Sequence, residues 1–170
     1  MCSCVHPNGK SLVLYAANAI QIYTVETKEK QAEAMLPEPA VFLKWIDATT
    51  LGIVTGSAVL HWTLGEAAPV KKFDRHPTLA QSQIINYKAS ADGKWCLLNG
   101  IAGGADGITG QLQLYSVERN VSQPVPAHAG TFATIPADQA DVFAFADKAG
   151  AGGSVRVSSR SCASADPPVR

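Results

Sequence analysis

One short pattern recurs along this chain of 170 residues and constrains its fold more than any other feature. Tyr23-Thr24-Val25, Trp62-Thr63-Leu64 and Tyr115-Ser116-Val117 each place an aromatic, a hydroxyl and an aliphatic residue at the end of an alternating apolar stretch. The stretch Val155-Arg156-Val157-Ser158 is a weaker fourth copy that lacks the aromatic residue. A repeat of about 40 to 50 residues that contains several short strands is typical of the blades of a β-propeller.

The residues ahead of each copy predict a second strand and a tight turn. Residues 11–15 and 51–54 are mostly apolar, and each stretch leads through a few small residues into the aromatic strand, which is a hairpin signal. Residues 95–98 do the same, but their connection passes through the glycine-rich stretch 103–110, which we expect to be a hairpin loop. We therefore expect an all-β chain of about four small antiparallel sheets. A β-sandwich would use similar strands but would not be expected to repeat one pattern at this period.

The composition narrows the class of protein. With 46% hydrophobic and 16% charged residues, the chain is typical of a folded domain, and its length is enough for one core. Fourteen basic residues balance fourteen acidic ones, so no overall charge would draw the protein to nucleic acid or to anionic lipid. There is no run of about 18 apolar residues, so we expect no transmembrane helix and only an indirect membrane role.

The four cysteines are scattered at positions 2, 4, 96 and 162, unlike the dense disulfide framework of a small secreted domain. We expect reduced thiols and a cytosolic protein. Cys2, Cys4 and His6 lie close together, but structural zinc takes about four ligands and its paired cysteines are usually about two to four residues apart. We therefore expect no metal site and no cofactor.

The residue types that catalysis requires are present, but no pattern predicts an active site. The segment 103–107 lacks the Lys-Ser/Thr pair of a phosphate-binding loop, and the histidines lack the spacing of a metalloprotease pair. We interpret His61 as a packed strand residue. Some propeller enzymes use carboxylates at a central channel, but Asp74, Asp92 and Asp106 stand beside turn-forming or charged residues and are interpreted as solvated. The chain is predicted not to be an enzyme.

A longer series of residues suggests a family. The segment Pro69 to Pro124 contains PVKKFDRH, QIINY, GKW and QLQLYSVERNVSQP in that order. Together with residues 16–30 and 42–62, it resembles the amino-terminal β-propeller of the clathrin heavy chain over most of residues 4–153. The resemblance implies a partial seven-bladed propeller, roughly blades two to five, over residues 1–153. The first blade is expected to be missing, and residues 154–170 are expected to be a divergent, disordered tail.

In this family, an extended peptide of the form Leu, apolar, any residue, apolar, acidic binds between the first two blades. Alternate side chains enter apolar pockets and lysines attract the acidic end. Ala19 stands where the family has threonine and Tyr23 where it has phenylalanine, and the opposite wall belongs to the missing blade. Without the resemblance, Tyr23 would be expected to pack and the lysines to face solvent. The positions that match this first groove are Leu12, Ala19, Gln21, Tyr23, Lys28 and Lys30.

Two further family sites have matching positions. The groove between the fourth and fifth blades is complete, although Trp95 and Leu114 alone would be interpreted as blade core. The site on the top face matches at Gln83, Ile85 and Ile101, and the rest of its wall lies in the missing first blade. The second-groove positions are Trp95, Leu114, Arg119, Val121, Gln123 and Val125.

The resemblance implies a non-catalytic, peptide-binding part of a vesicle coat protein in clathrin-mediated endocytosis and intracellular transport. Its expected location is the cytosolic face of coated pits and coated vesicles. The expected partners are adaptor proteins that carry Leu-apolar-x-apolar-acidic peptides. Binding of the clathrin light chain and self-trimerisation are expected only through the helical leg, which is absent. The alternatives are a generic propeller scaffold for protein interactions and a truncated fragment without independent function.

Overall fold

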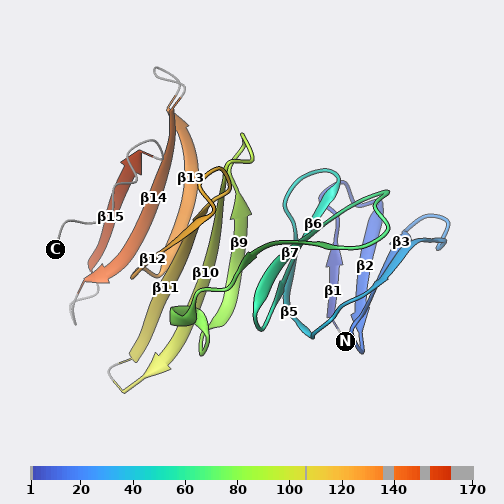
Figure 1. The fold of residues 1–170 in the computed structure, drawn as a ribbon, viewed down its shortest axis with the longest axis horizontal. Helices are drawn as coiled ribbons and strands as arrows, with labels where there is room; N and C mark the ends of the chain where they lie inside the picture. Colours follow the sequence, from blue (N-terminus) through green and yellow to red (C-terminus); the bar gives the residue numbers. More distant parts are fainter. Residues whose placement is uncertain (1, 106, 136–139, 150–153, 162–170) are drawn as a thin grey trace. The chain divides into compact units, whose positions relative to one another are not determined.

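The computed structural model describes residues 2–105, 107–135, 140–149 and 154–161. Within them the chain forms fifteen β-strands and one short 3₁₀ helix (Figure 1). The contacts divide it into two compact units, residues 1–75 and residues 76–170. Each unit contains two antiparallel sheets in which strands that follow one another in sequence lie side by side.

The first sheet is a four-stranded meander made by the first four strands. The β2–β3 turn consists of Ala17 and Asn18, which both have positive φ, at 49° and 67°. Two positive φ values in a two-residue loop match the twist of a β-hairpin, so this turn fixes the pairing of β2 with β3. The strands are β1 (Cys2–Val5), β2 (Ser11–Ala16), β3 (Ala19–Thr24) and β4 (Lys30–Met35).

The second sheet repeats this arrangement with β5 (Ala40–Trp45), β6 (Thr50–Thr55), β7 (Ala58–Thr63) and β8 (Val70–Asp74). Its inner strands β6 and β7 are buried along almost their whole length. They are accordingly rich in β-branched and other apolar residues on both faces.

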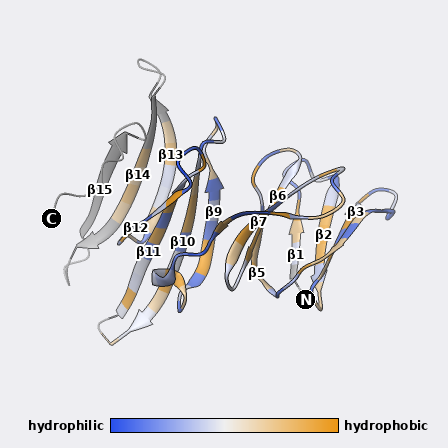
Figure 2. Cartoon of the chain, in the orientation of Figure 1, coloured by the Kyte–Doolittle hydropathy of each residue, from blue (hydrophilic) through white to orange (hydrophobic). Residues whose placement is uncertain are grey.

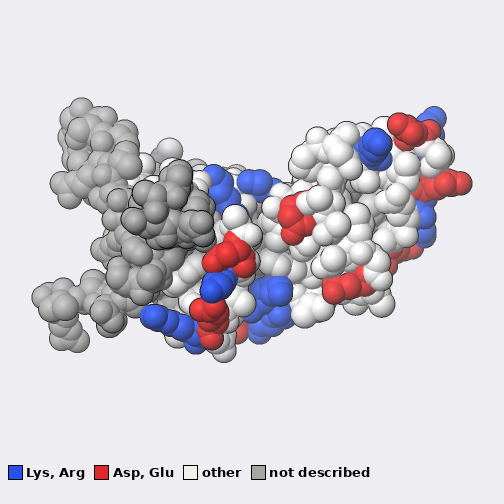
Figure 3. Space-filling model, turned by 90° about the horizontal axis from the view of Figure 1, so that it is seen from above, with Lys and Arg blue, Asp and Glu red and all other residues white. Residues whose placement is uncertain are grey.

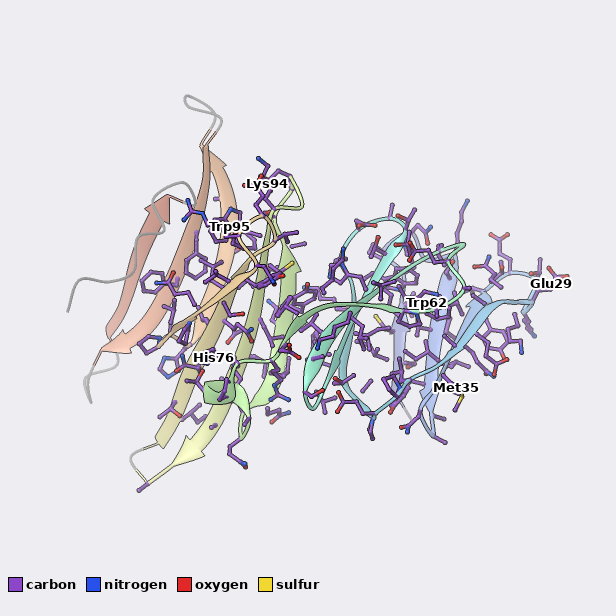
Figure 4. The ribbon with its side chains drawn as sticks, in the orientation of Figure 1. Glu29, Met35, Trp62, His76, Lys94 and Trp95 are labelled. Carbon is purple, nitrogen blue, oxygen red and sulfur yellow. The ribbon has the colours of Figure 1, made fainter. Side chains whose placement is uncertain are left out.

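One hydrophobic core joins the two sheets of the first unit. On β2 and β3 every second residue points toward this core, because successive side chains of a strand alternate between the faces. Trp62 is fully buried in it, and Figure 4 shows this side chain among the strands of the first unit. The members are Val13, Ile20, Ile22, Ala34, Leu36, Leu43, Trp45, Leu51, Ile53, Leu60 and Trp62.

The second unit opens with the 3₁₀ helix η1 (Pro77–Leu79), followed by the third sheet. The register of β9 against β10 shifts between Asn99 and Gly100, so a β-bulge lies there. The strands of this sheet are β9 (Gln83–Ala89), β10 (Trp95–Gly104), β11 (Gly107–Ser116) and β12 (Val121–Val125).

The fourth sheet has three strands, β13 (Ala129–Ile135), β14 (Ala140–Ala149) and β15 (Ser154–Ser161). It packs on the third sheet through a core in which Phe143 is almost completely buried. Figure 2 shows hydrophobic residues along β10 and β11, two strands of the third sheet. The core consists of Leu97, Leu112, Leu114, Val125, Ala127 and Phe143.

The repeated pattern occupies equivalent positions in three sheets. Tyr23, Trp62 and Tyr115 are each the penultimate residue of the third strand of a four-stranded sheet. Each lies opposite the second residue of the preceding strand. The prediction of an all-β chain built from blade-like sheets is confirmed, and the fold is a partial β-propeller.

Two stretches differ from the sequence-based expectation. Residues 103–110 were expected to form a loop, but Gly103 pairs with Ile108 and Gly104 with Gly107, so the strands extend almost to the hairpin tip. Main-chain hydrogen bonds need no side chain, which explains why glycine does not end this ladder. In the expected tail, Ser154–Ser161 instead pairs with β14 as strand β15. Apolar residues alternate there at 155 and 157, as in a strand. Residues 162–170 lie outside the described residues.

Candidate functional site

The predicted first groove maps to one face of the first sheet. Ala19, Gln21 and Tyr23 alternate along β3 and therefore point to the same side of the sheet. Leu12 lies directly opposite Tyr23 on β2 and shares that side. This surface is the open face of the first sheet, since the core residues Ile20 and Ile22 point the other way.

The open face is apolar and accessible. Leu12, Gln21 and Tyr23 are half-buried. At its margins Val5, opposite Leu12, is 58% exposed and Met35, opposite Ala19, is 67% exposed. Exposed apolar side chains grouped around half-buried ones are typical of an interaction surface.

The two predicted lysines lie at the β3–β4 hairpin beside this face. Lys30 lies opposite Tyr23, and Lys28 lies in the turn, with φ of 58°. Both are exposed. The ammonium of Lys30 pairs with the Glu33 carboxylate, which also accepts a hydrogen bond of 2.8 Å from Gln21 Nε2. The hydrogen bond between Lys30 and Glu33 raises the pKa of Lys30 and lowers the pKa of Glu33.

The predicted second groove lies on the face of the third sheet that packs against the fourth sheet. Leu114 pairs with Gln123, and Leu112 pairs with Val125, so these side chains share one side. Leu114 and Val125 are buried in the core between the sheets, as the simpler interpretation of blade core expects. Gln123 is half-buried, and Val121 is 57% exposed at the outer end of β12.

Trp95 and Arg119 complete this second site. Trp95 is half-buried and packs at the edge of the same core, and Figure 4 shows it among the strands of the second unit. Arg119 lies in the exposed β11–β12 turn, where its main-chain N–H donates to Ser116 Oγ at 3.3 Å. The accessible part of the second groove therefore consists of Trp95, Val121 and Gln123, with Arg119 in the turn that leads into β12.

The third predicted site is brought together only in part. Gln83 and Ile101 are directly paired between β9 and β10. Ile85 lies at the bulge of β9 and is 40% exposed. Gln83 is also exposed and Ile101 is half-buried, so these residues form a small, partly exposed patch where the start of β9 pairs with β10.

A pocket that the sequence did not indicate opens between the third and fourth sheets, on the side of β9 and β13. Its volume is about 350 Å³. Lys88 Nζ donates to Thr131 Oγ1 at 2.8 Å, and Asn99 Nδ2 donates to the main-chain oxygen of His128 at 3.1 Å. The sequence feature that could have indicated this pocket is the presence of polar residues on a strand face that otherwise packs against the next sheet. Its lining consists of Asn86, Lys88, Asn99, Ala129, Gly130, Thr131, Ala144, Phe145 and Ala146.

The residues considered for catalysis are placed as structural or solvated groups. Burial lowers the pKa of His61, a β7 residue, to about 4. Asp74 pairs with Lys71 at 2.6 Å on the surface, and Asp92 accepts a hydrogen bond from Ser90 at 2.5 Å within a turn. Asp106 lies outside the described residues.

The structure also bears on metal binding, membrane crossing and the distribution of charge. Among the described residues, no group of His, Cys, Asp and Glu side chains could hold a metal ion. In the same part of the chain, no helix is long and apolar enough to cross a bilayer. Figure 3 shows basic and acidic side chains interspersed over the face in view, in keeping with the balanced composition.

Comparison with known proteins finds similar clathrin heavy chains. No protein-family model matches the chain. It is 42% identical over 158 residues to the probable clathrin heavy chain 1 of Caenorhabditis elegans, a match that covers 90% of this chain and 9% of that protein. It is 40% identical over 158 residues to the clathrin heavy chain of Drosophila melanogaster, again over 90% of this chain and 9% of the relative. The chain thus spans a small part of these relatives.

The fold is also similar to that of solved structures. A crystal structure of the eukaryotic initiation factor matches with a TM-score of 0.52 and 15% sequence identity, over 95% of this chain and 41% of that one. At this identity the similarity concerns the fold alone.

Proposed function

The chain is a homologue of clathrin heavy chains and corresponds to 9% of their length, and from this premise we propose that it is a peptide-binding part of a vesicle coat protein. Clathrin heavy chains are structural proteins rather than enzymes, so the proposal assigns recognition and no catalysis. The ligands are extended segments of adaptor proteins with the form Leu, apolar, any residue, apolar, acidic. The sites are the first groove, on the open face of the first sheet, and the second groove, at the outer end of β12.

The observation that carries the proposal is the arrangement of the open face. Leu12 and Tyr23 lie opposite each other and leave apolar surface half-exposed, while lysines stand at one end. An extended peptide presents alternate side chains to one side, so its apolar residues can contact Leu12 and Tyr23. Its acidic end then reaches the lysines, which gives the peptide a direction.

The second groove supports the same function with different chemistry. Trp95 and Val121 offer apolar surface, and the half-buried Gln123 can both donate and accept hydrogen bonds to a peptide main chain. The third patch, Gln83, Ile85 and Ile101, is proposed as an accessory contact only. The coat role, the location at the cytosolic face of coated vesicles and the adaptor partners belong to the same proposal.

A direct test uses the 170-residue chain and a fluorescein-labelled peptide, Leu-Ile-Asn-Leu-Glu, with binding followed by fluorescence anisotropy. We expect saturable binding with a dissociation constant on the order of 10⁻⁴ M, because a short flexible peptide loses entropy and covers little surface. Lys28→Met should weaken binding by about two- to five-fold, as expected for an exposed charge contact. Lys72→Met, which changes an exposed lysine of β8, should leave it unchanged.

The second groove has its own pair of variants. Gln123→Ala should remove part of the bound peptide signal, whereas Gln81→Ala, at an exposed position outside the groove, should not. If the wild-type chain is folded and shows no saturable binding, the grooves are packed seams of a generic scaffold and the proposal is wrong. If the chain aggregates and binds hydrophobic dyes, it is a fragment without independent function.

Adaptors overcome weak single sites by presenting several peptides, and a coat presents many copies of each groove. Vesicles that carry the peptide at increasing surface density should therefore recruit the chain much more steeply than free peptide binds it. Recruitment that merely follows the free-peptide affinity would argue against a role in a multivalent coat.

A further inference from the structure

Three polar side chains of the open face form a chain of hydrogen bonds that ends on Glu33. The Tyr23 hydroxyl donates to Gln21 Oε1 at 3.0 Å, and Gln21 Nε2 donates to Glu33 Oε1 at 2.8 Å. The other carboxylate oxygen of Glu33 pairs with Lys30 Nζ. The register of β3 and β4 produces this arrangement, because Gln21 lies opposite Glu33 and Tyr23 lies opposite Lys30.

These bonds involve the groups that a peptide would need. Gln21 uses its oxygen for Tyr23 and one amide hydrogen for Glu33, which leaves it less able to bond a peptide main chain. Lys30 already faces the Glu33 carboxylate, so a second anion must displace or share that contact. Lys28 has no ion pair with any described residue and remains available.

Glu33 and Lys30 are both surface groups, so their pairing can be exchanged for another partner at little cost. The Lys30 and Glu33 side chains are 46% and 41% exposed. Contacts between exposed charges are weak and are screened by salt. A peptide carboxylate can therefore displace Glu33, but it must compete with it.

We infer that Glu33 is a built-in competitor for the acidic residue of the ligand at the first groove. The inference rests on the function proposed above, and it concerns how that groove is regulated. Glu33 occupies Lys30 and Gln21 in the free protein and adds a negative charge beside the acidic end of the peptide. It directs the ligand carboxylate to Lys28 and lowers the affinity of the groove for acidic peptides.

The first experiment measures the affinity of the labelled peptide Leu-Ile-Asn-Leu-Glu for wild type and Glu33→Gln. Glu33→Gln keeps the shape of the side chain and should tighten binding by about two- to five-fold at low salt. Glu29→Gln is the matched control, because it removes the same charge from the exposed tip of the β3–β4 hairpin (Figure 4). It should change the affinity much less. A peptide ending in Gln should show no such gain.

A double-mutant cycle makes the test specific for Lys30. In the wild-type background Lys30→Met removes no contact to the ligand but uncovers the Glu33 charge, so it should weaken binding less than the same change does in the Glu33→Gln background. In the Glu33→Gln background the same change should cancel the gain, so the two effects should not be additive. Saturable wild-type binding without a gain in Glu33→Gln would overturn this inference alone. Absence of saturable binding by both folded proteins would overturn the proposed function and this inference with it.

Discussion

The imidazole of His6 connects the β1–β2 turn to the main-chain oxygen of Ala48, in the β5–β6 turn. His6 Nε2 lies 2.9 Å from that oxygen, while His6 Nδ1 accepts a hydrogen bond of 3.1 Å from the N–H of Asn8. Because the main-chain N–H can only donate, the ring hydrogen must sit on Nε2. The ring also packs edge-on against Trp45, with 4.5 Å between ring centroids.

Replacement of His6 should therefore loosen the contact between the first two sheets. We expect His6→Leu to lower the free energy of unfolding by about 1–2 kcal/mol, since it removes two hydrogen bonds whose partners can turn to water. Urea unfolding followed by circular dichroism measures this loss. His6→Gln should recover part of it, because its amide can donate to Ala48. A His6→Leu protein as stable as wild type would contradict the assigned role.

Glu38 should make the stability of the first unit depend on pH in the acid range. Its carboxylate accepts hydrogen bonds from the Ser57 hydroxyl and, at 2.5 Å, from Thr55 Oγ1. These bonds, that of Ser57 first, lower the pKa of Glu38 below its ordinary value of 4.5. A carboxylate whose pKa is lowered in the folded state stabilises that state at pH values above its pKa in the unfolded chain. The contribution disappears as pH falls through the pKa of the folded state.

We therefore expect Glu38→Gln to be less stable than wild type at neutral pH, with a difference that shrinks below about pH 4.5. Urea unfolding of both proteins over the acid range measures it. Glu26→Gln, at an exposed turn position, serves as the control and should show no such change. A difference between Glu38→Gln and wild type that stays constant on acidification would exclude this explanation.

The sequence predicts the parts of the fold that depend on local pattern. The equivalent positions of Tyr23, Trp62 and Tyr115 follow from alternation along each strand, which places an aromatic residue on a fixed face. The grouping of Leu12 with Tyr23 follows from the tight turn between β2 and β3, because that turn fixes the register. The resemblance to a family then indicates which faces to examine.

The role of Glu33 could not be predicted in the same way. The pairing of β3 with β4 contains a bulge between Ile22 and Tyr23, and this bulge decides which β4 residues meet Gln21 and Tyr23. A shift of one residue would have turned Glu33 to the other face of the sheet. The pocket beside Lys88 was missed for a related reason, since it depends on how two sheets pack rather than on one strand.

Tyr87 should keep its proton far into the alkaline range. It is completely buried on β9, and burial, followed by the proximity of Cys96, raises the pKa of its hydroxyl above the ordinary value of 10.0. An acid whose pKa is raised in the folded state contributes stability at pH values below its pKa in the unfolded chain. This contribution is lost as pH rises further, because the unfolded chain ionises more easily.

The absorbance of tyrosinate in an alkaline titration tests this expectation. Tyr87 should ionise only together with unfolding, as followed in parallel by circular dichroism. Tyr87→Phe should reduce the loss of stability above about pH 10 relative to wild type. If all four tyrosines of the chain ionise while it remains folded, Tyr87 is not buried as described.

Gly110 should be intolerant of any side chain, whereas Gly103 on the neighbouring strand should accept one. A Cβ atom at Gly110 would lie 2.4 Å from the main-chain oxygen of Ala127 and 2.4 Å from the Cα of His128. Main-chain atoms cannot move aside as a flexible side chain can, so Gly110→Ala should cost about 1–3 kcal/mol or more.

A Cβ at Gly103 would meet nothing within 4 Å. Gly103→Ala should be neutral or stabilise by about 0.5 kcal/mol, because alanine loses less backbone freedom on folding. Thermal and urea unfolding of the two variants provide the comparison. Equal stability of the two would mean that the segment between β12 and β13 does not cross β11 at Gly110.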